Sequence, residues 1–160
     1  MSTNMSMTIG KHFISATTHV LSAMANIVPH AGTPYVKETM FAKGDVSAIV
    51  GITGHARGSI SVSFTKPCAI ALVKGMLGDD IQDIIQDTRD AVGEITNMIS
   101  GQARASLAEA GMVFQGATPT VIMGDGHTIG HVSRGPVIAI PFTTEHGEFT
   151  IEFCMDETKE

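Results

Sequence analysis

The sequence has few of the residues that mark disulfide-rich, nucleic-acid-binding or metal-binding proteins. Only two of its 160 residues are cysteines. Cys68 and Cys154 lie far apart in apolar surroundings, so we expect buried free thiols and neither a disulfide nor a metal pair. The ten lysines and arginines form no cluster, and the formal net charge is −6. A nucleic acid or an anionic membrane is therefore a poor partner, because binding phosphate groups requires a positive field.

Long apolar runs and internal repeats are also missing. The longest apolar run, Cys68–Val73, is far too short to cross a bilayer. The polar segment Met1–Gly10 lacks the charged-then-apolar order of a signal peptide, so we expect a cytoplasmic protein. Without a repeat or linker, residues 1–160 are expected to form a single domain. A content of 43% hydrophobic and 16% charged residues, with a mean hydropathy of +0.20, predicts extensive burial that includes a subunit interface.

The pattern of apolar residues predicts an α+β fold. The strict alternation of Ser59–Phe64 is typical of a strand with one buried and one solvent-exposed face, paired in a hairpin with the preceding strand. Pro29, Gly78 and Gly111 are expected to end the three helices. The element order α-β-β-α-α-β-β-β favours an antiparallel sheet with helices packed on one face. The expected elements are the helices Ile9–Val28, Pro67–Leu77 and Ile84–Ala110, the strands Val46–Thr53, Ser59–Phe64, Thr118–Met123, Val137–Thr143 and Glu148–Met155, and a short strand within Tyr35–Thr39.

The third helix carries the most informative pattern in the chain. At about 100° per residue, Asp90, Glu94, Asn97 and Gly101 fall on one side of the helix, here called the polar stripe. A carboxylate and an amide three residues apart on a helix are neighbours and point the same way. The opposite side is apolar and is expected to be buried, with Val92, Ile95, Ile99 and Ala103.

Small residues follow on the same side of the helix. Gly101, Ala105 and Ala108 add almost no side chain, which leaves room for a macromolecule to come close. We interpret the polar stripe as a surface that presents Glu94 and Asn97 to a partner. The alternative interpretation is an ordinary solvated helix face.

The other polar clusters carry no recognisable chemistry. His127 and His131 are four residues apart, but they lie in and beside the loop Gly124–Gly130, where this spacing does not align side chains. We therefore expect no metal site. The loop matches neither a dinucleotide fingerprint nor a P-loop and is expected to be a hairpin turn that can contact a partner. The absence of a nucleophile elbow disfavours a small-molecule enzyme.

The spacing Asp90-x₃-Glu94-x₂-Asn97-x₃-Gly101, followed by Pro119, resembles the signature helix of the CheX–CheC–FliY family of chemotaxis phosphatases. The resemblance covers nearly all of the chain. It includes the first hairpin of the family over Gly51–Phe64, its short helix over Lys74–Gly78 and the last CheX strand pair over Ile140–Phe153.

Within this family, the number of signature helices favours a CheX-type protein. Only one of the three asparagines, Asn97, has a glutamate three positions before it. CheC-type proteins carry two such helices, whereas CheX carries one. The short chain also argues against FliY, which has an extra motor-binding domain.

The resemblance implies a phosphatase that removes the phosphoryl group from the aspartyl phosphate of a CheY-type response regulator. The partner would hold Mg²⁺, so no cofactor is expected on this chain. Asn97 would orient the attacking water, and Glu94 would reach a cationic group of the partner. Contacts with the partner are expected at Asp90, Gly101, Arg104 and Ala105. The resemblance also implies a homodimer, and the alternative function is a receiver-binding adaptor without catalysis.

Overall fold

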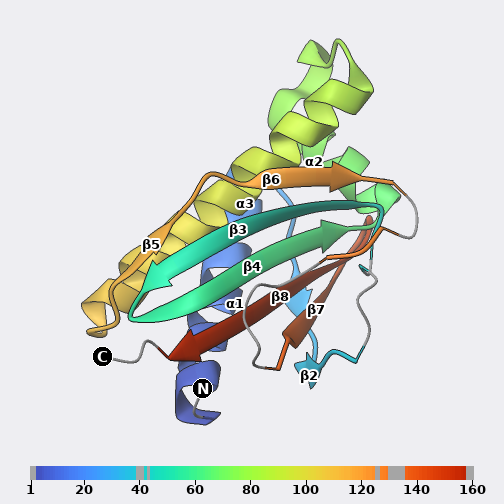
Figure 1. The fold of residues 1–160 in the computed structure, drawn as a ribbon. Coiled ribbons are helices and arrows are strands. Elements are labelled where there is room, and N and C mark those ends of the chain that lie inside the picture. Colours follow the sequence, from blue (N-terminus) through green and yellow to red (C-terminus); the bar gives the residue numbers. More distant parts are fainter. Residues whose placement is uncertain (1–2, 39–41, 43, 125–126, 130–135, 158–160) are drawn as a thin grey trace.

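The computed structural model describes residues 3–38, 42, 44–124, 127–129 and 136–157. Over these residues, eight strands form one antiparallel sheet (Figure 1). In spatial order, its strands are β1 (His30–Ala31), β7 (Ile138–Thr144), β8 (Gly147–Glu157), β4 (Ala56–Phe64), β3 (Val46–Gly54) and β5 (Phe114–Gly116), with β2 (Tyr35–Val36) also paired to β7 and β6 (Thr120–Met123) to β3.

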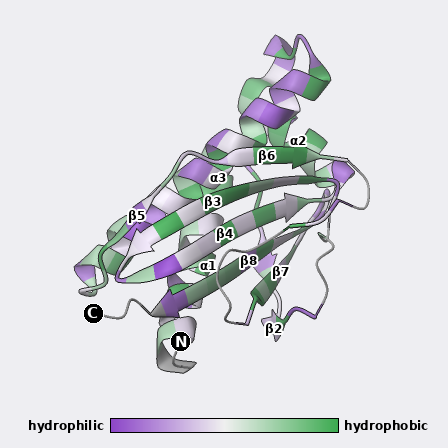
Figure 2. Cartoon of the chain, in the orientation of Figure 1, coloured by the Kyte–Doolittle hydropathy of each residue, from purple (hydrophilic) through white to green (hydrophobic). Residues whose placement is uncertain are grey.

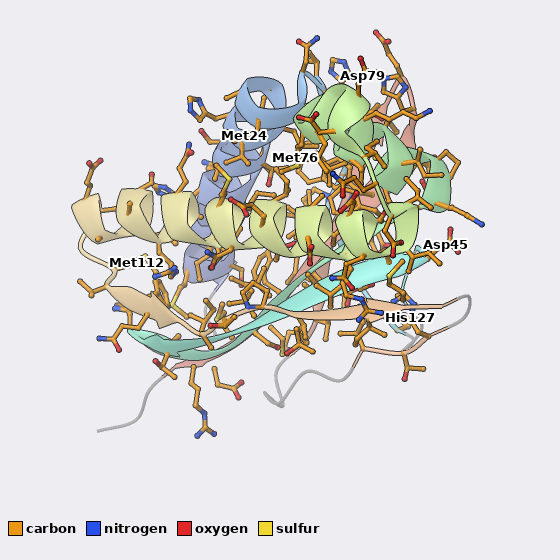
Figure 3. All side chains as sticks on the ribbon, turned by 90° about the horizontal axis from the view of Figure 1, so that it is seen from above. Met24, Asp45, Met76, Asp79, Met112 and His127 are labelled. Carbon is orange, nitrogen blue, oxygen red and sulfur yellow. The ribbon has the colours of Figure 1, made fainter. Side chains whose placement is uncertain are left out.

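Helices cover one face of this sheet, as predicted. They are α1 (Thr3–Ala25), α2 (Lys66–Leu77) and α3 (Ile84–Glu109), with a 3₁₀ turn, η1 (Gly78–Asp80), between α2 and α3. Figure 3 shows all three helices on the same side of β3. None of the helices within the described residues is long and apolar enough to cross a membrane. The element order of the prediction is confirmed, with β2 as the short strand expected within Tyr35–Thr39 and with the short strands β1 and β5 added.

The hairpin of β3 and β4 is longer than predicted. The prediction placed Gly58 in the turn, whereas the structure places it within β4. The sequence predicts a turn over Gly54–Gly58, but β4 already begins at Ala56. Gly54, with a φ of 117°, forms the tight turn. Gly58 instead pairs with Met155, and a Cβ atom on Gly58 would lie 1.8 Å from the carbonyl oxygen of Cys154. The close approach of β8 therefore requires this glycine.

The ends of α1 also differ from the prediction. The helix begins at Thr3, where the predicted start was Ile9. It ends at Ala25 because Asn26 adopts a left-handed conformation, with a φ of 55°. The amide of Ile27 then donates to the carbonyl of Leu21 over 3.1 Å.

The edge strands are shorter or were not predicted. The strand expected within Tyr35–Thr39 is the two-residue β2, and Thr39 lies outside the described residues. β5 was not predicted, because three residues show no clear alternation. The strand expected from Thr118 begins at Thr120, directly after Pro119, which cannot donate a ladder hydrogen bond.

The hydrophobic core lies between the helices and the sheet. Figure 2 shows apolar residues on the strands, and apolar and hydrophilic residues in alternation along α3. The largest side chains with less than 2% exposure come from the helices and from four central strands: Phe13, Phe64, Phe142, Phe149, Phe153, Ile9, Leu21, Ile52, Ile60, Leu72, Ile95 and Ile99.

The opposite face of the sheet is buried too, which corrects one prediction. The serines of β4, expected to face solvent, have exposed fractions of 4% or less. Ser63 Oγ lies 2.6 Å from Ser47 Oγ, which in turn lies 2.6 Å from Nε2 of His127. A second polar contact, 2.8 Å between Lys37 Nζ and Glu152 Oε2, joins side chains that are 3% and 0% exposed. Small side chains on this face therefore allow the segments around Lys37 and His127 to cover it closely.

Candidate functional site

Local side-chain contacts fix the start of α3 and thereby the orientation of the polar stripe. The Asp83 carboxylate caps the helix by accepting hydrogen bonds from the amides of Ile85 (3.1 Å) and Gln86 (3.2 Å). The Asp87 carboxylate accepts from the amides of Gln82 (2.9 Å) and Asp83 (3.2 Å). Two carboxylates near the positive end of the helix dipole both satisfy otherwise free amides and favour the helix.

The burial of α3 agrees with the predicted periodicity. Val92, Ile95 and Ile99 are fully buried, whereas Glu94 and Asn97 are exposed. Among the described residues, neither Glu94 nor Asn97 has a hydrogen-bond or ion-pair partner. The structure therefore presents a carboxylate and an amide, one helical turn apart, on the outer surface of the helix layer.

Asp90, at the start of the polar stripe, is exposed but held in place. Its Oδ1 accepts a hydrogen bond of 2.8 Å from Nε2 of Gln86, one turn earlier on the same helix. The sequence analysis did not single out Gln86. Its spacing of four residues from Asp90 is the signal that would have identified it.

Arg104 differs from the rest of the predicted site, because its side chain lies against the sheet. Its Nε donates to Oγ of Ser100 over 3.2 Å. A Cβ atom on Gly116 of β5 would lie 2.9 Å from Nε and 3.0 Å from Cζ of Arg104. The guanidinium group therefore rests on the backbone of β5. Arg104 also lines a small internal void together with Leu107 and Phe114.

Gly101 opens a shallow space on the polar stripe. A Cβ atom there would meet only Nη2 of Arg104 within 4 Å, at an ordinary contact distance of 3.8 Å. Packing within the chain therefore does not require glycine at this position. Ala105, one turn later, is exposed. Together the two positions leave the helix backbone accessible to a partner.

Among the described residues, the other polar groups do not form a second site. Both cysteines are buried, as predicted, and neither belongs to a disulfide. Burial raises the pKa of the Cys68 thiol to about 11, opposed by a hydrogen bond with Thr144. Ser47 is adjacent to His127 but fully buried, so no substrate reaches it. His131 lies outside the described residues, and within them no three His, Cys, Asp or Glu side chains are arranged to hold a metal ion.

Known proteins match the chain over the elements that carry this site. The family model described as chemotaxis phosphatase CheX matches residues 46–143, a range that includes all of α3. The chain is also 27% identical over 118 residues to the CheY-P phosphatase CheX of Thermotoga maritima. That alignment covers 73% of this chain and 75% of the relative.

Solved structures share the fold. The crystal structure of a chemotaxis protein CheX from Desulfovibrio desulfuricans is 74% identical, with a TM-score of 0.88, and covers 92% of this chain and 99% of that chain. A CheX–CheY–BeF3–Mg²⁺ complex from Borrelia burgdorferi is 22% identical, with a TM-score of 0.73, and covers 92% of this chain and 97% of that chain. The predicted α+β fold is confirmed.

Proposed function

This chain belongs to the CheX family of chemotaxis phosphatases, and from this premise we propose that it hydrolyses the aspartyl phosphate of a phosphorylated CheY-type response regulator. The Thermotoga maritima relative, named as a CheY-P phosphatase, supports the reaction. The observation that carries the proposal is the pair Glu94 and Asn97, exposed one turn apart and without partners among the described residues.

In the proposed mechanism, Asn97 positions the water that attacks the phosphorus atom. The amide carbonyl accepts a hydrogen bond from this water, while the amide NH₂ is free to donate to a neighbouring oxygen. Attack in line breaks the bond between phosphorus and the carboxylate oxygen of the partner, releasing inorganic phosphate and the free aspartate. The partner supplies the phosphoryl group and Mg²⁺, so positioning is the main task left to this chain.

Glu94 is proposed to hold the complex in the correct register. Its carboxylate would pair with a cationic group beside the active site of the response regulator. The open backbone at Gly101 and Ala105 supports a close approach of the partner along α3.

The test is the single-turnover decay of a phosphorylated receiver domain at saturating concentrations of this protein. Asn97→Ala should slow the accelerated decay by about 100-fold or more, the cost of losing one preorganised polar group at a reaction centre. Binding should change little, because the contact matters mainly in the transition state. Wild-type acceleration by Asn97→Ala would contradict the mechanism. Tight binding without any acceleration by the wild-type protein would favour the adaptor function.

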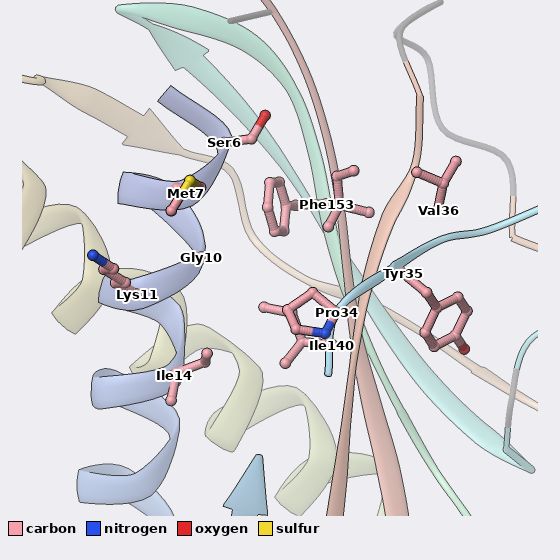
Figure 4. Close-up of a pocket in the computed structure, with 11 residues that line it drawn as sticks. Ser6, Met7, Gly10, Lys11, Ile14, Pro34, Tyr35, Val36, Ile140 and Phe153 are labelled. Carbon is pink, nitrogen blue, oxygen red and sulfur yellow. The ribbon is translucent and has the colours of Figure 1, made fainter. Parts of the chain in front are cut away.

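We also propose a cytoplasmic homodimer of single CheX-like domains acting in two-component signalling. Because the far face of the sheet is buried, we place the pairing surface at a strand edge, and of the two edges we choose β1–β2 for the apolar groove beside it. A groove of about 460 Å³ lies between α1 and this edge and is lined largely by apolar side chains (Figure 4). Met7 and Val36 on its rim are 55% and 58% exposed. A second copy would cover both groove and edge, and a purely monomeric protein in sedimentation at micromolar concentration would contradict this.

A further inference from the structure

The charges around the polar stripe have opposite signs at its two ends. Asp90 and Glu94 lie towards the start of α3, and Arg104 lies towards its end, with Asn97 between them. We propose that this polarity sets the direction in which the receiver domain docks, with a cationic group of the partner facing Asp90 and Glu94 and an acidic group facing Arg104. The inference rests on the proposed function and adds a second recognition element to it.

The structure holds both ends of the stripe in place before any partner arrives. Gln86 holds Asp90 through the 2.8 Å hydrogen bond, and Ser100 holds Arg104 through the 3.2 Å hydrogen bond. In each case the residue lies one turn earlier on the same helix. Groups that are already ordered lose less conformational freedom on binding, so their charges contribute more to recognition.

The charge of Arg104 is available to a partner. Within the described residues, Arg104 takes part in no ion pair. Nε of Arg104 is engaged by Ser100, and Nη2 would lie 3.2 Å from a Cβ atom on Gly116 and 3.8 Å from one on Gly101, so the guanidinium group lies between β5 and the open position on the polar stripe. A guanidinium group retains donors on both terminal nitrogens when Nε is occupied, and these donors match a carboxylate.

The distance between the two ends suits one docked domain. Asp90 and Arg104 are separated by about 21 Å along the axis, at about 1.5 Å per residue. The bond from Arg104 back to Ser100 brings the guanidinium group closer to Asn97 than its own Cα atom. A partner that buries about 800 Å² of its surface over Asn97 spans both ends.

A series of charges at position 104 tests the proposal. Arg104→Lys, Arg104→Met and Arg104→Glu should be assayed for kcat and KM with a phosphorylated receiver domain, at low and high salt. We expect KM to rise in the order Lys, Met, Glu, with an increase of about two- to fivefold for Met at low ionic strength and little change in kcat. The differences should shrink as salt is added, because the screening length falls. Arg89→Gln, an exposed arginine on the same helix but off the stripe, is the matched control.

The same series separates docking from a role in folding. If Arg104 only packs α3 against β5, the KM values of Arg104→Lys and Arg104→Met should rise equally, because both variants lack the planar group that rests on Gly116. Their defects would persist at high salt and follow the thermal stability. That result, or an unchanged KM in all three variants, would overturn the proposal.

A failure of the proposed function can be recognised independently. If the wild-type protein does not accelerate phosphate loss, the dissociation constant of a receiver domain loaded with BeF3 and Mg²⁺ replaces KM as the measurement. A dissociation constant that rises in the order Arg104→Lys, Arg104→Met, Arg104→Glu would support the docking direction even without catalysis. Equal dissociation constants for the three variants would overturn the proposal.

Discussion

The outer surface of α3 and the far face of the sheet are both rich in polar side chains, yet they are organised in opposite ways. On α3, Glu94 and Asn97 are exposed and lack partners among the described residues. On the sheet, Ser47 and Glu152 are fully buried and are paired with His127 and Lys37. Most buried polar side chains are hydrogen-bonded within the protein, although Ser61 Oγ on this face has no partner among the described residues, whereas exposed ones remain free to recognise another molecule.

The register of the sheet shows which residues flank the buried Glu152 carboxylate. Tyr35 pairs with Ala139, Ala139 with Glu152, and Glu152 with Ser61. Directly opposed residues in antiparallel strands share a face, so these four form one row across the sheet. The row comes from four different strands, and short-range sequence patterns cannot detect it. A polar residue in a strand therefore does not by itself indicate solvent or function.

The largest expected effect is a loss of stability caused by a substitution on the far face of the sheet, with little effect on activity. Lys37→Met should lower the free energy of unfolding by about 3–5 kcal/mol, because it removes the cation that contacts the buried Glu152 carboxylate. The rate of phosphate loss per folded molecule should stay near that of the wild type, since Lys37 lies far from the polar stripe in the fold. Urea unfolding and single-turnover decay measure the two quantities.

Lys37→Met/Glu152→Gln provides the control if the single variant is too unstable to purify. Removing both charges should recover part of the lost stability, because a neutral amide is less costly to bury than an unpaired carboxylate. A single variant as stable as the wild type would show that the ion pair is not what holds this face together.

An intermediate effect is expected on the exposed surface. Glu94→Ala should raise the half-saturating concentration of the phosphorylated receiver domain about tenfold and also lower turnover, with a defect that depends on salt. The free energy of unfolding should change by less than about 0.5 kcal/mol, because an exposed helical side chain rarely supports a fold. Glu109→Ala, an exposed glutamate near the end of the same helix, is the control. A large loss of stability in Glu94→Ala would contradict the contrast between the two surfaces.

The sequence predicted the helix-borne features best, because they depend on local spacing. The exposure of Glu94 and Asn97 and the burial of Ile95 follow from 3.6 residues per turn and are confirmed. The catalytic role of Asn97 stays a prediction. Features that depend on distant segments were missed. Ser61 was assigned to a solvent-exposed face, because nothing in its own strand reveals that other segments cover it, and Gly58 was assigned to a turn because the approach of β8 is not visible locally.

Arg104 has one feature that depends on local spacing and one that depends on a distant segment. Its position beside the polar stripe was predictable from helical spacing, whereas its contact with Gly116 depends on β5, a strand of three residues that no pattern indicated. The helical position of a candidate site residue can therefore be predicted from the sequence, whereas the orientation of its side chain cannot. The orientation decides whether the charge faces a partner or the scaffold.

The smallest expected effect is a change in the ionisation of Tyr35, which lies at the exposed end of the row that contains Glu152. Burial, followed by the negative charge of Glu152, raises the pKa of Tyr35 above 10.0. The chain has one tyrosine and no tryptophan, so ultraviolet absorbance of the phenolate reports on Tyr35 alone. The neutral phenol is favoured in the folded state, and its contribution to stability is therefore constant below pH 10 and is lost as the pH rises through the raised pKa. Glu152→Gln should move the pKa part of the way back towards 10.0, because burial remains, whereas Glu94→Gln on the polar stripe should leave it unchanged. A wild-type midpoint at or below 10.0, or equal shifts in the two variants, would show that Tyr35 does not sense the buried carboxylate.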